Sequence, residues 1–209
     1  MILIAIPTAS GKLRYEVIGS LMMLQKTLDK DDSIMFLPQM QVYEARNLAV
    51  KTAIEENYDY LVFIDDDMIV PDNFIQRVKE EDKDIFCALS VDRKGENQVK
   101  VFKQVTYIDK QITFRYEHIK NEELGTGVVE IGATGMACTA IKREVFKNIY
   151  DKCLGMAFEF RNQIVGETKL HLSEDIDFCD KAKRLGYKIF VDTSLLTGHI
   201  GEPIIHYLK

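Results

Sequence analysis

Three consecutive aspartates, Asp65, Asp66 and Asp67, directly follow the apolar run 60–64 (YLVFI). Carboxylates this close repel, and at ~5 Å with an effective dielectric constant of ~20 one pair costs roughly 3 kcal/mol. A divalent cation removes that penalty, because Mg²⁺ and Mn²⁺ take oxygen ligands and bridge to phosphates. In an extended chain Asp65 and Asp67 share one face and Asp66 takes the other. The cluster predicts a metal site, with a solvated acidic turn before Pro71 as the alternative.

A second acidic pair, Glu174 and Asp175, stands at the start of a predicted helix, directly after Ser173, a favourable N-cap residue. Acidic side chains in a first helical turn also complement the helix dipole, which would explain the pair without chemistry. Further along, His199 lies in the glycine-flanked segment 197–201 (TGHIG). A lone histidine is usually structural or exposed, but small neighbours and the affinity of imidazole for Mn²⁺-type metals make His199 a candidate ligand.

An α/β architecture must position these residues, because short apolar runs alternate with amphipathic stretches in the first half. The pattern predicts strands at 2–6, 34–37, 60–64 and 84–89, and helices at 15–28, 43–56 and 73–80. Continuous apolar strands joined by helices predict a parallel sheet covered on both faces. Functional groups in such sheets lie outside the carboxyl ends of the strands, which points to 7–9 and 65–67.

The second half of the chain has a different pattern. Alternating runs within 97–118 predict antiparallel strands, and 125–141 is glycine-rich and apolar. We predict helices at 142–150 and 174–185, the latter ended by Gly186, then a strand at 188–192 and an irregular tail at 193–209. We expect one domain over 1–209, with a nucleotide-binding half at 1–90 and an acceptor-side half at 91–209.

Composition narrows the function classes. The chain has 209 residues, of which 46% are hydrophobic, and a net charge of −6, which argues against general nucleic-acid binding. No stretch reaches the ~18 apolar residues of a membrane span, and the N-terminus lacks the pattern of a signal peptide. None of the four cysteines belongs to a CxxC pair, so we interpret them as reduced core residues of a cytoplasmic protein, in the host cytoplasm if the protein is viral.

In their order and spacing, six segments resemble glycosyltransferases of the GT-A fold, particularly family 2-like enzymes and the small single-domain versions encoded by phages and large viruses. They are IAIPTASG at 4–11, EARN at 44–47, LVFIDDDMIVP at 61–71, GATGMACTAIKREVF at 132–146, SEDIDFCDKAKRLGYKIFVD at 173–192 and GHIG at 198–201. The resemblance covers most of the chain. It implies a single GT-A (Rossmann-like) domain with a mostly parallel central sheet flanked by helices and a small antiparallel element in the second half.

The resemblance also implies roles for the candidate residues. Contacts with the nucleotide, its diphosphate or the sugar are expected from Pro7, Thr8, Ala9, Arg46, Asp65, Asp66, Gly135 and Met136. Arg46 would lie near the nucleotide or diphosphate, and Gly135 and Met136 would border the sugar and acceptor. Metal ligands would be Asp67 and His199, with Asp65 facing the ribose or the metal shell. Asp175 would be the catalytic base, with Glu174 beside it.

The implied reaction moves a sugar from a UDP- or GDP-sugar to a hydroxyl of a glycan or glycoconjugate, with Mn²⁺ or Mg²⁺ as cofactor. The glycosyl–phosphate bond breaks through an oxocarbenium-like state, the metal and Arg46 neutralise the departing diphosphate, and Asp175 takes the acceptor proton. Inversion at the anomeric carbon is expected. The alternatives are a retaining glycosyltransferase of the same fold, a sugar nucleotidyltransferase and a non-catalytic sugar-nucleotide-binding subunit.

Overall fold

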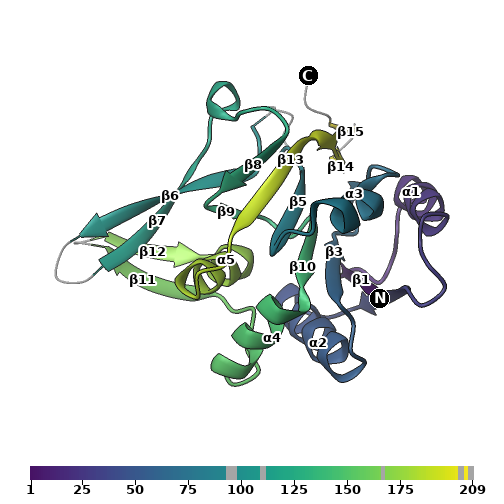
Figure 1. Ribbon diagram of the computed structural model, residues 1–209, viewed down its shortest axis with the longest axis horizontal. Coiled ribbons are helices and arrows are strands. Elements are labelled where there is room, and N and C mark those ends of the chain that lie inside the picture. The colour runs from purple at the N-terminus through teal and green to yellow at the C-terminus, as the bar shows by residue number, and fades with distance from the viewer. Residues whose placement is uncertain (93–97, 109–111, 166–167, 202–204, 207–209) are drawn as a thin grey trace.

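The computed structural model describes residues 1–92, 98–108, 112–165, 168–201 and 205–206. A 7-stranded sheet with the order β2-β1-β3-β10-β5-β13-β8 forms its centre (Figure 1). The strands that run in one direction are β2 (Ser33–Pro38), β1 (Ile2–Thr8), β3 (Tyr60–Ile64), β5 (Ile85–Leu89) and β13 (Ile189–Leu196). The strands β10 (Cys138–Lys142) and β8 (Val128–Ile131) run the opposite way. The predicted α/β class with a mostly parallel central sheet is confirmed.

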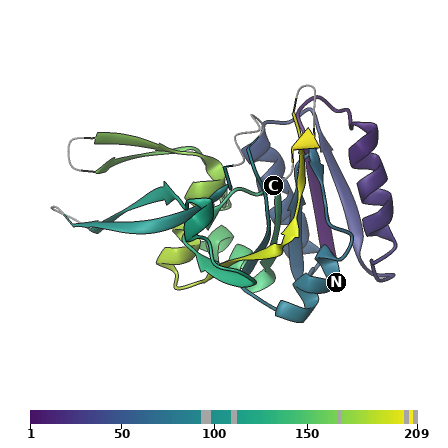
Figure 2. The ribbon, with the colours of Figure 1, turned by 90° about the horizontal axis from the view of Figure 1, so that it is seen from above.

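Helices cover both faces of this sheet (Figure 2). One face packs against α1 (Tyr15–Gln25) and α3 (Phe74–Glu81), and the other against α2 (Val42–Glu55), α4 (Arg143–Lys152) and α5 (Glu174–Arg184). The side chains of β1 alternate between these layers, with Ile4 in the α1 and α3 layer and Ala5 in the other. Burial on both faces explains why this strand is a continuous apolar run.

Two helices differ in detail from the predicted pattern. Helix α1 ends at Gln25 rather than at 28. In α2 the expected apolar stripe holds at its three alanines, but Leu48 is 38% exposed, whereas Arg46 and Val50 are buried. The buried face of α2 is therefore turned toward Arg46, because that side chain has ion-pair partners inside the fold.

Small antiparallel elements stand beside the sheet. The hairpin of β6 (Val101–Ile108) and β7 (Ile112–His118) confirms the antiparallel strands predicted within 97–118, and it also pairs with β9 (Ala133–Thr134). A second hairpin, β11 (Arg161–Val165) and β12 (Thr168–Leu172), was not predicted. Both hairpins project from the same side of the molecule (Figure 2). A short 3-10 helix spans Asn121–Glu123.

The prediction of an irregular tail from 193 onward is wrong. Strand β13 continues to Leu196, and β14 (Gly198–Ile200) pairs antiparallel with β4 (Met68–Ile69) and with β15 (Ile205–His206). These strands are two or three residues long and their partners are distant in sequence, so no local periodicity marks them. The pairing places residue 199 opposite residue 68, next to the aspartates that follow β3.

The cysteines are free thiols, and three of them, Cys87, Cys138 and Cys179, are buried as predicted, while Cys153 is half-buried. Burial raises the pKa of Cys87 to about 12. Burial also raises the pKa of Cys138 and Cys179, so the three buried thiols are protonated packing groups at neutral pH. Among the described residues, no helix combines the length and the apolar character that crossing a bilayer requires.

Candidate active site

The acidic cluster lies in a turn at the carboxyl end of β3. The Asp65 N–H donates to the Ala137 carbonyl at 3.0 Å, and the Met68 N–H donates back to the Asp65 carbonyl at 3.2 Å. Because the chain turns here, the extended alternation predicted for the aspartates is wrong. Asp65 contacts Arg46 and Asp67 contacts His199, so the two side chains have different partners.

Arg46 joins two acidic segments that are far apart in the sequence. One terminal nitrogen contacts Glu174 Oε1 at 2.5 Å and the other contacts Asp65 Oδ1 at 3.0 Å. The side chain is 3% exposed, and its guanidinium lies 5.8 Å and 5.9 Å from the ring centroids of Phe63 and Phe158. This bridge holds the end of β3 against the start of α5.

The pKa values of Arg46 and Glu174 are shifted because the one buried guanidinium lies close to several carboxylates. Burial alone lowers the pKa of Arg46, but the charges of Asp65, Asp175 and Glu174 outweigh it and raise the pKa. Burial raises the pKa of Glu174, the Arg46 charge opposes that rise, and Asp175 adds to it. Both terminal nitrogens of Arg46 contact carboxylates, and the side chain also lines a cavity with them, so its expected place near the nucleotide or diphosphate stays a prediction. Glu174 accordingly serves as a partner that holds Arg46 in place.

Asp175 is held at the first turn of α5. Its Oδ1 accepts hydrogen bonds from the Ser173 hydroxyl and from the Ile176 N–H, the latter at 2.8 Å. Ser173 occupies the predicted N-cap position, but its side chain bonds Asp175 instead of capping the helix backbone. A Cβ added at Gly135 would lie 3.3 Å from Asp175 Oδ2, so the absence of a side chain there leaves room for this carboxylate.

Two adjoining cavities contain most of the predicted residues. The first, here called the Arg46 cavity, has a volume of about 330 Å³ and is lined by Pro7, Ala9, Met40, Val42, Arg46, Asp65, Asp66, Glu174 and Asp175. The second, the Asp67 cavity, has about 730 Å³ and is lined by Ala9, Ser10, Lys12, Leu13, Arg14, Asp66, Asp67, Ile200 and Gly201. Ala9 and Asp66 border both, so the two cavities lie next to each other.

His199 is oriented toward Asp67 by a backbone carbonyl. The Val91 carbonyl lies 2.7 Å from Nδ1, and because a carbonyl oxygen can only accept, Nδ1 carries the proton. In a neutral imidazole the lone pair is then on Nε2, which lies 3.3 Å from Asp67 Oδ2. The Ile200 N–H also donates to the Asp67 carbonyl at 2.9 Å. A histidine fixed through its other nitrogen is the usual arrangement around a protein-bound metal.

Asp67 and His199 form a two-residue donor set. In the described part of the chain, no group of three or more His, Cys, Asp and Glu side chains is arranged to hold a metal ion. The set fits a hard divalent cation that fills its remaining positions with phosphate oxygens and water. It does not resemble a closed structural zinc site, which takes four protein ligands.

Two residues predicted to contact the donor or acceptor are buried. Thr8 is 4% exposed, and its hydroxyl donates to the Lys12 carbonyl at 3.2 Å, so it supports the loop after β1 rather than lining a cavity. Met136 is 1% exposed and packs in the core, because an apolar side chain between β9 and β10 gains more from burial than from solvent contact. The expected position of Met136 beside the sugar and acceptor stays a prediction that this burial does not favour.

Sequence reasoning missed the basic side chains of the site. Lys12 and Arg14, in the loop after β1, line the Asp67 cavity opposite Asp66 and Asp67. The rule that functional groups follow the carboxyl ends of strands would have found them if it had been extended beyond residue 9. The role of the Val91 carbonyl could not be predicted from the sequence, because every residue has a backbone carbonyl.

Comparison with known proteins supports the fold. No protein-family model and no curated protein matches the chain. Among solved structures, A197 from STIV has a TM-score of 0.65 at 20% identity, over 95% of this chain and 85% of that one. TarS from S. aureus has 0.50 at 15% identity, over 92% of this chain and 35% of that one. The UTP-bound UGPase from Acinetobacter baumannii has 0.46 at 8% identity, over 94% and 88%.

Proposed function

We propose that this chain is a nucleotide-sugar-using enzyme, and specifically a metal-dependent glycosyltransferase that moves a sugar from a nucleoside-diphosphate sugar to an acceptor hydroxyl. One observation carries the proposal: Arg46 bridges Asp65 and Glu174, so that Asp175 borders the same cavity as two of the aspartates that follow β3. The fold shared with A197 and TarS is compatible with it.

The two cavities suit the two ends of such a donor. The Asp67 cavity combines acidic side chains with Lys12 and Arg14, which suits a diphosphate accompanied by a cation. In the proposal, Mn²⁺ or Mg²⁺ at Asp67 and His199 supplies Lewis-acid stabilisation of the leaving diphosphate. Lys12 and Arg14 add positive charge to the Asp67 cavity, and the Arg46 guanidinium adds it to the adjoining Arg46 cavity.

Asp175 is the proposed base for the acceptor hydroxyl. Its Oδ1 is fixed by the Ser173 hydroxyl and the Ile176 N–H, and Oδ2 is next to Gly135 at the cavity edge. A carboxylate held by one oxygen can take a proton with the other as the hydroxyl attacks the anomeric carbon. Glu174 cannot share this role while Arg46 holds it, so a single base and inversion at the anomeric carbon are proposed.

A donor screen tests the proposal. UDP-glucose, UDP-galactose, UDP-N-acetylglucosamine and GDP-mannose are each incubated with the protein and Mn²⁺, and release of nucleoside diphosphate is measured with and without pyranoside acceptors. We expect turnover with at least one donor and loss of that turnover in EDTA. Absence of both transfer and donor hydrolysis across the panel would contradict the proposal. The anomeric configuration of the product, read by NMR, distinguishes inversion from retention.

A second candidate function has one observation in its favour. Lys12 and Arg14 follow β1 and line the cavity, as a loop that holds a triphosphate would require. A sugar nucleotidyltransferase would then release pyrophosphate from a nucleoside triphosphate and a sugar phosphate. The loop contains one glycine, Gly11, and a phosphate-cradling loop usually contains more. Pyrophosphate release with UTP and glucose 1-phosphate, without sugar transfer, would favour this function over the first.

A non-catalytic subunit would behave differently from both. It would bind a donor with Mn²⁺ and give no turnover in the parent protein, and Asp175→Asn would leave that binding unchanged. The donor screen, the pyrophosphate assay and a measurement of donor binding together separate the three functions.

A further inference from the structure

An exposed aromatic side chain, Phe160, directly precedes strand β11. It is 61% exposed, although it belongs to a segment whose other aromatic side chain, Phe158, is fully buried. Strand pairing fixes its place: Arg161 at the start of β11 lies opposite Leu172 at the end of β12. Phe160 therefore lies at the end of the hairpin from which the chain continues through 173–175 to the candidate base.

The second ring of this surface comes from α2. The rings of Tyr43 and Phe160 are in edge-to-face contact, with their centroids 5.9 Å apart and an interplanar angle of 77°. Tyr43 directly follows Val42, which lines the Arg46 cavity together with Asp175. The aromatic pair thus connects the rim of the Arg46 cavity to the hairpin, and Tyr43 leaves most of the Phe160 ring exposed.

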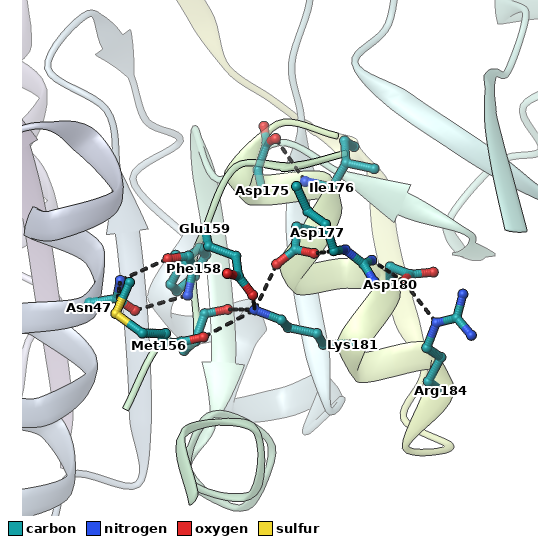
Figure 3. Close-up of polar contacts among 12 residues, drawn as sticks. Asn47, Met156, Phe158, Glu159, Asp175, Ile176, Asp177, Asp180, Lys181 and Arg184 are labelled. Carbon is teal, nitrogen blue, oxygen red and sulfur yellow. Dashed lines mark hydrogen bonds and ion pairs between the residues drawn. The ribbon is translucent and has the colours of Figure 1, made fainter. Parts of the chain in front are cut away.

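The backbone beneath Phe160 is fixed on its α2 side. The Asn47 amide forms two hydrogen bonds with the Phe158 backbone, donating to the carbonyl at 2.8 Å and accepting from the N–H at 2.9 Å (Figure 3). The Phe158 ring stacks on Phe178 of α5 with centroids 4.4 Å apart. Phe158 is thereby held from α2 and α5 together.

Helix α5 fixes the same segment through charge. The Lys181 ammonium donates to the carbonyls of Met156 and Ala157 at 3.1 Å and 3.3 Å, and it contacts the carboxylates of Glu159 at 2.8 Å and Asp177 at 2.7 Å (Figure 3). These contacts extend along 156–159, immediately before Phe160. In Figure 3 the Asp175 side chain points away from this cluster.

Arg161 completes the attachment on the other side of Phe160. It forms ion pairs with Asp177 at 2.6 Å and with Asp180, and both aspartates are fully buried. Since α5 also carries Asp175, one helix positions both the base and the exposed ring. A rigidly supported, solvent-exposed ring is preorganised for a flat ligand, because little conformational entropy is lost on binding.

The chemistry around the ring indicates a sugar. Asn162, two residues further along the chain, is exposed and polar, whereas the carboxylate of Glu159 is paired with Lys181. Ile164, further along β11, is 67% exposed. A pyranose has one face of C–H groups and a rim of hydroxyls, which suit an exposed aromatic ring with an exposed amide, that of Asn162, nearby on the chain.

We propose that the Phe160 ring, supported by Tyr43, is the acceptor subsite and that it binds a pyranose of the acceptor by stacking. The inference rests on the proposed glycosyl transfer, because it assigns the acceptor side of that same site. The stacked sugar presents a hydroxyl toward Asp175, and the acceptor is a glycan rather than a peptide or lipid headgroup.

The test uses Phe160→Ala, Phe160→Trp and, as a matched control, Phe36→Ala. Phe36 is 50% exposed on the edge strand β2, so the control removes a comparable exposed ring away from the site. Two activities are measured with the donor that gives turnover in the screen and Mn²⁺: donor hydrolysis without acceptor, and transfer to a panel of p-nitrophenyl pyranosides. Saturation-transfer NMR with methyl pyranosides, which needs no donor, reports binding independently.

We expect Phe160→Ala to raise the acceptor KM by about tenfold, the equivalent of one aromatic contact, while donor hydrolysis stays within about twofold. Phe160→Trp and Phe36→Ala should keep the parent acceptor KM. An unchanged acceptor KM in Phe160→Ala, or an equal loss of donor hydrolysis, would overturn the subsite.

Failure of the proposed function is distinguishable from failure of the subsite. If the parent protein hydrolyses no donor, the glycosyltransferase proposal fails, and the NMR measurement then judges the ring alone. Saturation of a methyl pyranoside that is lost in Phe160→Ala but kept in Phe36→Ala supports the subsite. If no pyranoside is saturated by the parent protein, the subsite is overturned.

Discussion

Arg46 is the single residue on which the geometry of the candidate site depends. It is buried, its two terminal nitrogens contact Asp65 and Glu174, and the nearby charge of Asp175 also stabilises its guanidinium. Removing one partner of a buried ion pair leaves an uncompensated charge, which is more damaging than the absence of the whole pair. The main role of Arg46 is therefore to link the end of β3 to the start of α5, and its position near the substrate follows from that link.

The role of Asp175 can be isolated by a substitution that keeps its shape. Asp175→Asn removes the proton acceptor, and we expect kcat for transfer to fall by about 10²- to 10⁴-fold. The rise in Tm caused by donor with Mn²⁺ should be preserved, because Asp175 does not hold the diphosphate in the proposal. Steady-state kinetics and thermal shift measure the two effects, with the exposed Asp72→Asn as control. Transfer at the parent rate would remove Asp175 from the mechanism.

Gly135 offers a test of how tightly that carboxylate is positioned. In Gly135→Ala the new Cβ would lie 3.3 Å from Asp175 Oδ2, so the carboxylate must shift by a few tenths of an ångström. We expect kcat to fall by about tenfold, since small displacements of a reacting group are costly, while Tm changes little. An unchanged kcat would show that Oδ2 tolerates displacement and is not the proton acceptor.

Glu174 predicts a pH-dependent stability. Burial raises its pKa above the ordinary 4.5, so above pH 4.5 the unfolded chain releases the proton while the folded chain retains it. The native state then binds more protons than the unfolded state, and its stability falls as the pH rises through this interval, by up to about 1.4 kcal/mol per pH unit. The Glu174→Gln variant has no titrating carboxyl group at this position, so its stability does not fall in this way as the pH rises.

Urea unfolding of the parent and Glu174→Gln, repeated at intervals from about pH 4.5 to neutral, measures the difference. We expect the difference in free energy of unfolding to move in favour of the glutamine variant as the pH rises. Parallel curves would mean that Arg46 holds Glu174 ionised throughout, so that burial does not dominate its pKa.

At the scale of elements, the segment 156–160 is fixed between α2 and α5. Asn47→Leu deletes both hydrogen bonds to the Phe158 backbone and leaves its N–H and carbonyl unsatisfied. We expect the free energy of unfolding to decrease by about 2–4 kcal/mol, because each unsatisfied buried group is costly.

Urea unfolding tests this, with Asn148→Leu as a matched control. Asn148 donates one hydrogen bond, to the Tyr187 hydroxyl, and its loss should cost about 1 kcal/mol. Equal losses would show that Asn47 does not fix the segment.

Periodicity predicted the helices and the long strands of this fold because their signals are local. Strands 2–6 and 60–64 and the helices that follow them were recognisable from apolar runs and amphipathic stripes. The order of the sheet was not recognisable, since β10 inserts antiparallel between β3 and β5 through contacts about 50 to 80 positions apart. Strands β4 and β14, with two and three residues, carry too few side chains for any pattern.

The candidate site was predictable to a similar extent. The aspartates after β3 and the pair at the start of α5 were found because they occupy positions with a general rule behind them. The contact partner of each side chain was not predictable. In the helix that carries Arg46, the apolar stripe lies beside the arginine, and only the packing of α2 shows that the arginine is buried. Lys12 and Arg14 follow the first strand, but their loop has a single glycine and so only weakly resembled a phosphate-binding loop.

At the scale of the whole molecule, binding should stabilise the fold only when the site is complete. The site carries five carboxylates, at positions 65–67, 174 and 175, with Arg46, Lys12 and Arg14 as the basic side chains that line the cavities. UDP alone adds negative charge to this site, and Mn²⁺ alone lacks its phosphate ligands. We expect little change in Tm with either one, and a clear rise with both.

The size of that rise follows from mass action. At a ligand concentration of about 100 times Kd the native state gains about 2.7 kcal/mol, which is several degrees in Tm for a chain of this length. EDTA should abolish the shift, and Asp67→Asn and His199→Gln should each weaken it. A full shift with UDP in EDTA would show that the nucleotide binds without a metal.

The pairing of β14 with β4 determines when the proposed metal site can form during folding. Asp67 and His199 are 132 positions apart, and His199 reaches Asp67 only when β14 lies along β4. A chain still being synthesised has the aspartates long before it has the histidine. The proposed two-ligand site therefore cannot form before β14 pairs with β4, and a chain in which this pairing is open presents Asp67 without His199 to divalent ions in solution. Metal binding at this site would then indicate that β14 has paired with β4.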